Sequence, residues 1–111
     1  MKRLACYLVP LLMTGTAHAA SYYHSVDALE NLRLAYDRNN PEAKAIYFQG
    51  YVAGVADSTH GSAWCPPSNI SALRAYDIVS KYMKAHLPTA NQDAAGIVTM
   101  ALGASFPCPV K

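Results

Sequence analysis

The sequence predicts an all-α protein, a compact bundle of four main helices closed by one disulfide. Apolar residues recur at helical spacing in four segments, and clusters of Asn, Pro and Ser separate these segments. Two cysteines remain once the N-terminal segment is assigned to export. No segment shows the alternation of apolar and polar residues that is typical of a half-buried strand.

Residues 1–19 have the composition of a secretory signal peptide. The basic pair Lys2-Arg3 precedes an apolar run, and Ala17-His18-Ala19 places small residues where a signal peptidase recognises them. We expect cleavage after Ala19, with cleavage after Ala20 as the alternative, and a single exported domain over residues 20–111. The apolar run is shorter than the roughly 20 residues that span a bilayer, so no membrane association is expected after cleavage.

Cleavage of this segment changes the net charge. The full chain has nine Lys and Arg against seven Asp and Glu, a formal net charge of +2. Because Lys2 and Arg3 leave with the signal peptide, the remaining chain carries equal numbers of both charges. We therefore expect no binding to nucleic acid and little repulsion against self-association.

Cys65 and Cys108 remain after export and are predicted to form a disulfide, because oxidising compartments favour cysteine pairs. Two buried free thiols are the alternative. For a loop of about 44 residues, the chain-entropy model gives a stabilisation of roughly 4 kcal/mol. Cys6 would be the anchor cysteine of a lipoprotein, but no apolar region precedes it, so this alternative is not favoured.

The first helix is predicted over Val26–Arg38, with Ser25 as its N-cap. Arg33 and Asp37 lie four residues apart, and we expect both on the solvent side. The apolar side follows helical spacing and comprises Val26, Leu29, Leu32 and Tyr36.

The second helix is predicted to start at Pro41, behind an Asn40 cap, and to end at Asp57 or Ser58. Gln49 is the only strongly polar side chain between Ala45 and Ala56. A helix that is apolar on every side is either buried centrally or shared with a partner.

Gly50 and Gly54 leave one face of this second helix nearly bare. Each glycine inside a helix costs about 1 kcal/mol relative to alanine. The close approach of another helix would offset that cost. We favour a tight crossing within the chain, and the alternative is the seam of a homodimer.

An irregular stretch is predicted from Thr59 to Ile70, because Pro66 and Pro67 prevent helix continuation. It carries Trp64, which we expect to form a lid on the core, with a binding hot spot as the alternative.

Two further helices follow. The third is predicted over Ala72–His86 with Ser71 as its cap, and the fourth starts behind Thr89, where Gln92 completes a capping-box spacing. The apolar side of the third helix comprises Ala75, Ile78, Val79, Tyr82 and Met83. That of the fourth comprises Ala94, Ile97, Val98, Ala101, Leu102 and Ser105.

No catalytic, metal or cofactor site is predicted. His24, His60 and His86 have no second ligand at metal-binding spacing, apart from Asp57 and Cys65 near His60. A disulfide sulfur is neither a zinc ligand nor a nucleophile, so these two residues do not complete a site. Tyrosine is abundant and is enriched at protein interfaces, although helix-spaced tyrosines more often pack in a small core.

Several groups of residues resemble the Rap/Tai family of bacterial immunity proteins. Residues Gly50 to Asp57 resemble its signature helix, and the match spans about Ile46 to Cys108. One departure is His86-Leu87-Pro88, where the family more often has His-Pro directly. The other matching groups are Cys65-Pro66-Pro67, Ser71, Ile78 to Met83, Ala101-Leu102 and Phe106-Pro107-Cys108.

The resemblance implies a periplasmic, disulfide-bonded, non-enzymatic protein that often forms homodimers. Such a protein neutralises a cognate toxin of the type VI secretion system, typically a peptidoglycan amidase, by filling its substrate groove. A periplasmic stress or holdase-type binding protein without a toxin partner is the alternative. Two exposed regions outside the core pattern are the candidate contacts, namely Thr59, His60, Ser62 and Trp64 in the loop and His86, Thr89 and Asn91 in the later turn.

Overall fold

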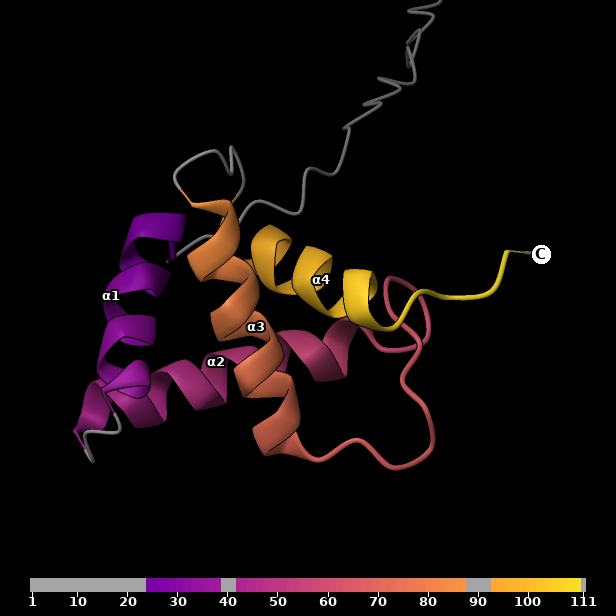
Figure 1. Ribbon diagram of the computed structural model, residues 1–111, viewed down its shortest axis with the longest axis horizontal. Coiled ribbons are helices and arrows are strands. Elements are labelled where there is room, and N and C mark those ends of the chain that lie inside the picture. The colour runs from indigo at the N-terminus through magenta and orange to yellow at the C-terminus, as the bar shows by residue number, and fades with distance from the viewer. Residues whose placement is uncertain (1–23, 39–41, 88–92, 111) are drawn as a thin grey trace, which may run out of the picture.

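The computed structural model describes residues 24–38, 42–87 and 93–110. These ranges form four helices and no strand, which confirms the predicted all-α class (Figure 1). The predicted signal peptide lies outside the described residues. No helix in the described ranges is long and apolar enough to cross a membrane. The helices are α1 (Val26–Asp37), α2 (Ala43–Thr59), α3 (Ala72–His86) and α4 (Ala94–Ser105).

Two of the predicted N-caps are confirmed. The Ser25 hydroxyl accepts a hydrogen bond from the Ala28 N–H at 3.2 Å at the start of α1. The Ser71 hydroxyl accepts one from the Arg74 N–H, also at 3.2 Å, at the start of α3. Each bond satisfies a backbone donor that the first helical turn leaves without a partner.

The N-caps predicted for the other two helices are wrong, by two residues for α2 and by four for α4. α2 has Glu42 as its N-cap, without a side-chain cap bond, and α4 has Asp93, whose Oδ1 accepts from the Gly96 N–H at 2.6 Å. A carboxylate is a stronger cap than a hydroxyl at the positive end of a helix. The predicted caps Asn40 and Thr89, with Pro41 and Gln92, lie outside the described residues.

The four helices pack around one core, and every pair of them is in contact. In Figure 1, α2 crosses the lower part of the view, α1 and α3 stand across it, and α4 lies beside α3. Residues from all four helices are fully buried, so each helix contributes to the same core. The largest are Leu29, Phe48, Val52, Val79, Met83, Ile97, Val98 and Leu102.

The apolar sides of α3 and α4 agree largely with the predicted ones. Ala75, Val79 and Met83 of α3 are buried, while Ile78 and Tyr82 pack partly buried against the core. The predicted face of α4 is buried from Ala94 to Leu102, and only Ser105 is exposed.

The predicted disulfide between Cys65 and Cys108 is confirmed. It joins the loop after α2 to the segment after α4, and the Cys65 N–H donates to the Phe106 carbonyl at 2.9 Å beside it. The two segments are therefore held together by a covalent bond and by a backbone hydrogen bond.

The solvent-side placement predicted for Arg33 is wrong, because its side chain is only 4% exposed. Its guanidinium donates to both Glu30 oxygens at 2.6 Å and to Asp37 at 3.1 Å. It also donates to the Ser80 hydroxyl of α3 at 3.3 Å, so it joins α1 to α3. The hydrogen bond to Glu30 is the main reason that the pKa of Arg33 is raised. A buried cation is tolerated where its charge and its donors are paired in this way.

A second polar contact joins the same two helices. The Tyr36 hydroxyl donates to the Asp77 carboxylate of α3 at 2.6 Å. Burial, followed by this hydrogen bond, raises the pKa of Tyr36 well above its usual value. The phenol therefore remains a hydrogen-bond donor throughout the neutral pH range.

We predict that Cys65→Ala lowers the free energy of unfolding by about 4 kcal/mol under oxidising conditions, because it releases the loop-closure constraint on the unfolded chain. Thermal and urea denaturation with and without dithiothreitol measure this loss. The double variant Cys65→Ala/Cys108→Ala is the control, and its stability should not respond to the reductant. An unchanged melting temperature in the single variant would contradict the role given to the disulfide.

We predict that Arg33→Met lowers the free energy of unfolding by about 2 kcal/mol. Breaking a fully buried ion pair costs about 3–5 kcal/mol, and the smaller value follows because Glu30 and Asp37 keep contact with water. Urea denaturation measures the change. Arg38→Met, at the exposed end of α1, is the matched control and should change stability little. Equal losses in the two variants would contradict the stabilising role given to the buried hydrogen bonds and ion pairs of Arg33.

Candidate functional site

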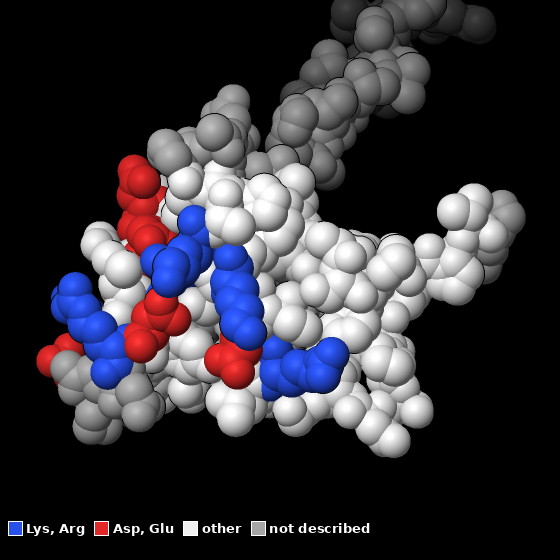
Figure 2. Space-filling view, in the orientation of Figure 1, with Lys and Arg blue, Asp and Glu red and all other residues white. Residues whose placement is uncertain are grey.

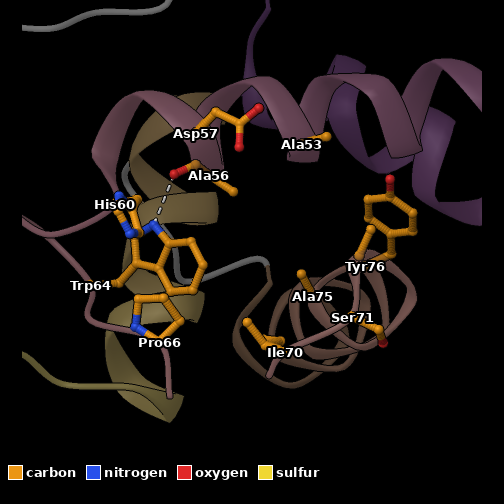
Figure 3. Close-up of a pocket in the computed structure, with 11 residues that line it drawn as sticks. Ala53, Ala56, Asp57, His60, Trp64, Pro66, Ile70, Ser71, Ala75 and Tyr76 are labelled. Atoms are coloured by element: carbon orange, nitrogen blue, oxygen red, sulfur yellow. Dashed lines mark hydrogen bonds between the residues drawn. The ribbon is translucent and has the colours of Figure 1, made fainter. Parts of the chain in front are cut away.

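A cavity of about 270 Å³ opens beside the end of α2 (Figure 3). The last turns of α2, the loop that follows and the first turns of α3 form its walls. We call it the α2–α3 pocket. Its lining residues are Ala53, Ala56, Asp57, His60, Trp64, Pro66, Ile70, Ser71, Ala72, Ala75 and Tyr76.

The loop beside the pocket is fixed by hydrogen bonds to the end of α2. The Thr59 carbonyl accepts from the backbone N–H groups of Ser62 and Ala63 at 3.2 and 3.0 Å. Gly61 has a φ of +81°, a conformation that side chains disfavour, and its N–H donates to the Trp64 carbonyl at 2.8 Å. The loop is therefore a tight turn with its own internal bonds.

Trp64 closes the core beneath this turn. It is 5% exposed, and its indole N–H donates to the Ala56 carbonyl at 3.1 Å. Its ring lies against Phe106, with centroids 6.3 Å apart, and so links the loop to the segment after α4. Trp64 therefore forms the expected lid on the core, and it also lines the pocket.

The other loop residues singled out from the sequence lie around the same turn. Thr59 is half-buried and donates its hydroxyl to the Val55 carbonyl at 2.7 Å. Ser62 is exposed and donates to the Thr59 carbonyl at 3.0 Å. His60 is exposed, and its ring meets Trp64 edge-on with centroids 6.2 Å apart. These side chains form one exposed rim at the end of α2.

His86 is not part of this group. α3 begins at the pocket and ends at His86, and its 15 residues correspond to a length of about 20 Å. His86 is exposed and stacks on the Tyr82 ring at 3.9 Å between centroids. The other residues predicted for this turn, Thr89 and Asn91, lie outside the described residues. The structure therefore places the loop group and His86 at opposite ends of α3.

Sequence reasoning did not assign Asp57, Ile70 or Tyr76 to a binding site, although all three line the pocket. Asp57 could have been recognised from the sequence, because it is the only acidic residue in α2. Tyr76 was one of several tyrosines at helical spacing. Its position across the pocket from Asp57 depends on how α3 packs on α2.

Among the residues that line the pocket, Asp57 is the only Asp, Glu, Lys or Arg. Residues 58–73 and 94–110 contain no Asp, Glu, Lys or Arg, and we call these two segments together the uncharged surface. Figure 2 shows both signs of charge over α1 and α3, whereas the area over α4 and the C-terminal segment is free of them. The disulfide joins the two halves of this surface.

The crossing predicted within the chain at Gly50 and Gly54 is wrong. Both glycines are exposed, and a Cβ added to either would meet no atom within 4 Å. The buried side of α2 instead consists of Ala45, Phe48, Val52 and Ala56. The opposite side exposes Ile46 and Tyr47, at 64% and 52%, next to the two glycines. We call Ile46, Tyr47, Gly50 and Gly54 the α2 stripe.

Within the described ranges, no group of three or more His, Cys, Asp and Glu side chains could hold a metal ion. The pocket contains one carboxylate, one imidazole, a phenol and a serine hydroxyl among apolar side chains. This arrangement is suited to recognising a group on another molecule.

The described residues form a small helical domain with a pocket at the end of α2. The model of the family described as Rap1a immunity proteins matches residues 18–108. The chain therefore belongs to the Rap1a immunity protein family, and the resemblance found in the sequence is confirmed. Family membership implies that it binds a cognate toxin. No curated protein matches the sequence.

Proposed function

We propose that this immunity protein acts in the periplasm, where it inhibits a peptidoglycan amidase of the type VI secretion system by covering the active site. The uncharged surface is the observation that carries this proposal. The cores of protein interfaces are depleted in charged residues, and a standard interface covers about 800 Å² per partner. The exposed residues of the segments 58–73 and 94–110 carry no formal charge.

The uncharged surface is also rigid, which favours inhibition by steric occlusion. The loop turn, the indole hydrogen bond of Trp64 and the disulfide fix the loop before any partner arrives. A preformed surface loses little conformational freedom on binding, so more of the contact energy contributes to affinity. Leu73 and Met100 are exposed within it and supply apolar contact area.

Two features support action in the periplasm. The Cys65–Cys108 disulfide is typical of proteins from oxidising compartments. Residues 1–19 have the composition of a cleaved export signal.

We predict that the protein, when exported to the periplasm, protects cells from an amidase toxin encoded beside it and co-purifies with that toxin. Growth under toxin induction and amidase activity on purified peptidoglycan are the two measurements. Binding of unfolded clients in general, without protection from the toxin, would instead support a holdase.

Ser62→Glu places a charge on the uncharged surface and should weaken toxin binding at least ten-fold, about 1.4 kcal/mol.

His86→Glu is the matched control, because it introduces the same charge at the far end of α3. Its affinity for the toxin should stay near that of the wild type. If His86→Glu weakened toxin binding and Ser62→Glu did not, the toxin would contact the other candidate region, which includes His86, Thr89 and Asn91.

We also propose that two copies of the chain associate through the α2 stripe. The stripe has exposed apolar side chains beside two glycines, where another helix could approach closely. A chain of nearly zero net charge offers little repulsion against this association. The four residues of the stripe lie outside the segments 58–73 and 94–110 that make up the uncharged surface.

We predict that Gly54→Arg converts a dimer into a folded monomer, because the side chain would project from the α2 stripe into a partner. Light scattering after size-exclusion chromatography measures the mass. Gly54→Ala is the control for folding and should stabilise the monomer by about 0.5–1 kcal/mol. A wild-type protein that stays monomeric at high concentration would contradict the dimer.

A further inference from the structure

Asp57 occupies an electrostatically unfavourable position in the fold. It lies in the last turn of α2, where the helix dipole places partial negative charge. That turn contains no basic residue, and no Lys or Arg lines the adjoining pocket. A carboxylate in this position is stabilised neither by the helix nor by a cation nearby.

The polar groups around the pocket leave this carboxylate without a partner. Among the described residues, neither a hydrogen bond nor an ion pair joins Asp57 to another side chain. The Tyr76 hydroxyl across the pocket makes no hydrogen bond with the described residues either. The His60 ring instead faces Trp64. Figure 3 shows Asp57 projecting from α2 on one side of the pocket and Tyr76 from α3 on the other.

The rest of the pocket is apolar and small. Ala53, Pro66, Ile70 and Ala75 form much of its wall. Its volume of about 270 Å³ lies below the range of roughly 300–1,000 Å³ that is usual for pockets of small-molecule ligands. A single side chain from another protein fits this size. Asp57 is exposed and has no ion pair among the described residues, so its carboxylate favours a cationic side chain.

We propose that the α2–α3 pocket receives an arginine side chain of the bound toxin, with Asp57 as its ion-pair partner. This inference rests on the proposed function, since it assumes that a toxin covers the uncharged surface around the pocket. The methylene stem would pack against Ile70 and Ala53, and the guanidinium would meet the Asp57 carboxylate and the Tyr76 hydroxyl. Asp57 then supplies the charged contact inside an otherwise uncharged interface.

Arginine fits this site better than lysine or an anion. Its planar guanidinium is weakly hydrated, bonds a carboxylate through two parallel hydrogen bonds and stacks on aromatic rings. The ammonium of lysine is strongly hydrated and would lose more on entering apolar walls. The start of α3 would attract an anion, but the Ser71 hydroxyl already caps that turn and Asp57 repels negative charge. Arginine is also among the residues enriched at interface hot spots.

The first experiment does not need the toxin. A capped tripeptide with arginine at its centre is titrated into the full protein, and the same peptide with neutral citrulline is the matched probe. The chain has one tryptophan, Trp64, so its fluorescence reports the pocket, and amide NMR shifts locate the site. We expect saturable binding of the arginine peptide alone, with at least ten-fold loss of affinity in Asp57→Asn. Equal responses to both peptides, or no response, would overturn the assignment of this pocket to arginine.

The second experiment uses the toxin encoded beside the gene. Asp57→Asn should weaken toxin binding about 30-fold, the size typical of a hot-spot residue. Its melting temperature should equal or exceed that of the wild type, because the substitution removes a carboxylate from the negative end of α2. Glu42→Gln is the control, since it removes one negative charge from the opposite end of the same helix. Its affinity for the toxin should not change.

The outcomes separate the two proposals. Equal toxin affinity of the wild type and Asp57→Asn would overturn the arginine site and leave the immunity function intact. If no neighbouring toxin binds the wild type, the proposed immunity function is wrong. The titration with the arginine and citrulline peptides then tests the arginine site by itself. A loss of stability in Asp57→Asn, matched by its loss of binding, would assign Asp57 a structural role and overturn the proposal.

Discussion

The disulfide between Cys65 and Cys108 determines how this domain presents its binding surface. Without it, the loop after α2 and the segment after α4 would be joined only by the Cys65–Phe106 backbone bond and by the contact of Trp64 with Phe106. These two segments carry the uncharged surface. One covalent bond thus stabilises the fold and fixes the relative position of the two segments that form the proposed toxin contact. Folded domains are stable by only about 5–15 kcal/mol, so a disulfide that contributes about 4 kcal/mol has a large effect.

The treatment of charge differs between the two ends of the bundle. Between α1 and α3, Arg33 is buried among Glu30, Asp37 and Ser80, and every charge there has a partner. At the end of α2, Asp57 faces a pocket without a cation. The first arrangement stabilises the fold, since leaving a buried charge unpaired is costly. The second keeps a charge available for another molecule, and natural proteins commonly accept such local costs at binding sites.

The limits of sequence-based prediction follow from particular residues. The helices were predictable because the stripes of α3 and α4 repeat with the helical period, and Ser25 and Ser71 are common N-caps. Arg33 was misplaced because periodicity assigns a charged residue to solvent and contains no information about Ser80, 47 positions away. Gly50 and Gly54 were assigned to a crossing within the chain because bare helix faces commonly pack, yet the other helices cover the opposite side of α2. For the candidate site, the loop around His60 was predictable, whereas the position of Asp57 and Tyr76 on the walls of one pocket was not.

The sequence by itself determined the four helices, the cysteine pair and the family, because each of these depends on residue type and spacing along the chain. Only the tertiary structure decided which side of α2 stays exposed, that Arg33 points inward, and that the loop around His60 and the residue His86 lie at opposite ends of α3. These features depend on which helices meet, and that choice follows from the packing of side chains far apart in the sequence. Local patterns do not encode such contacts, since burial is a property that several segments create together.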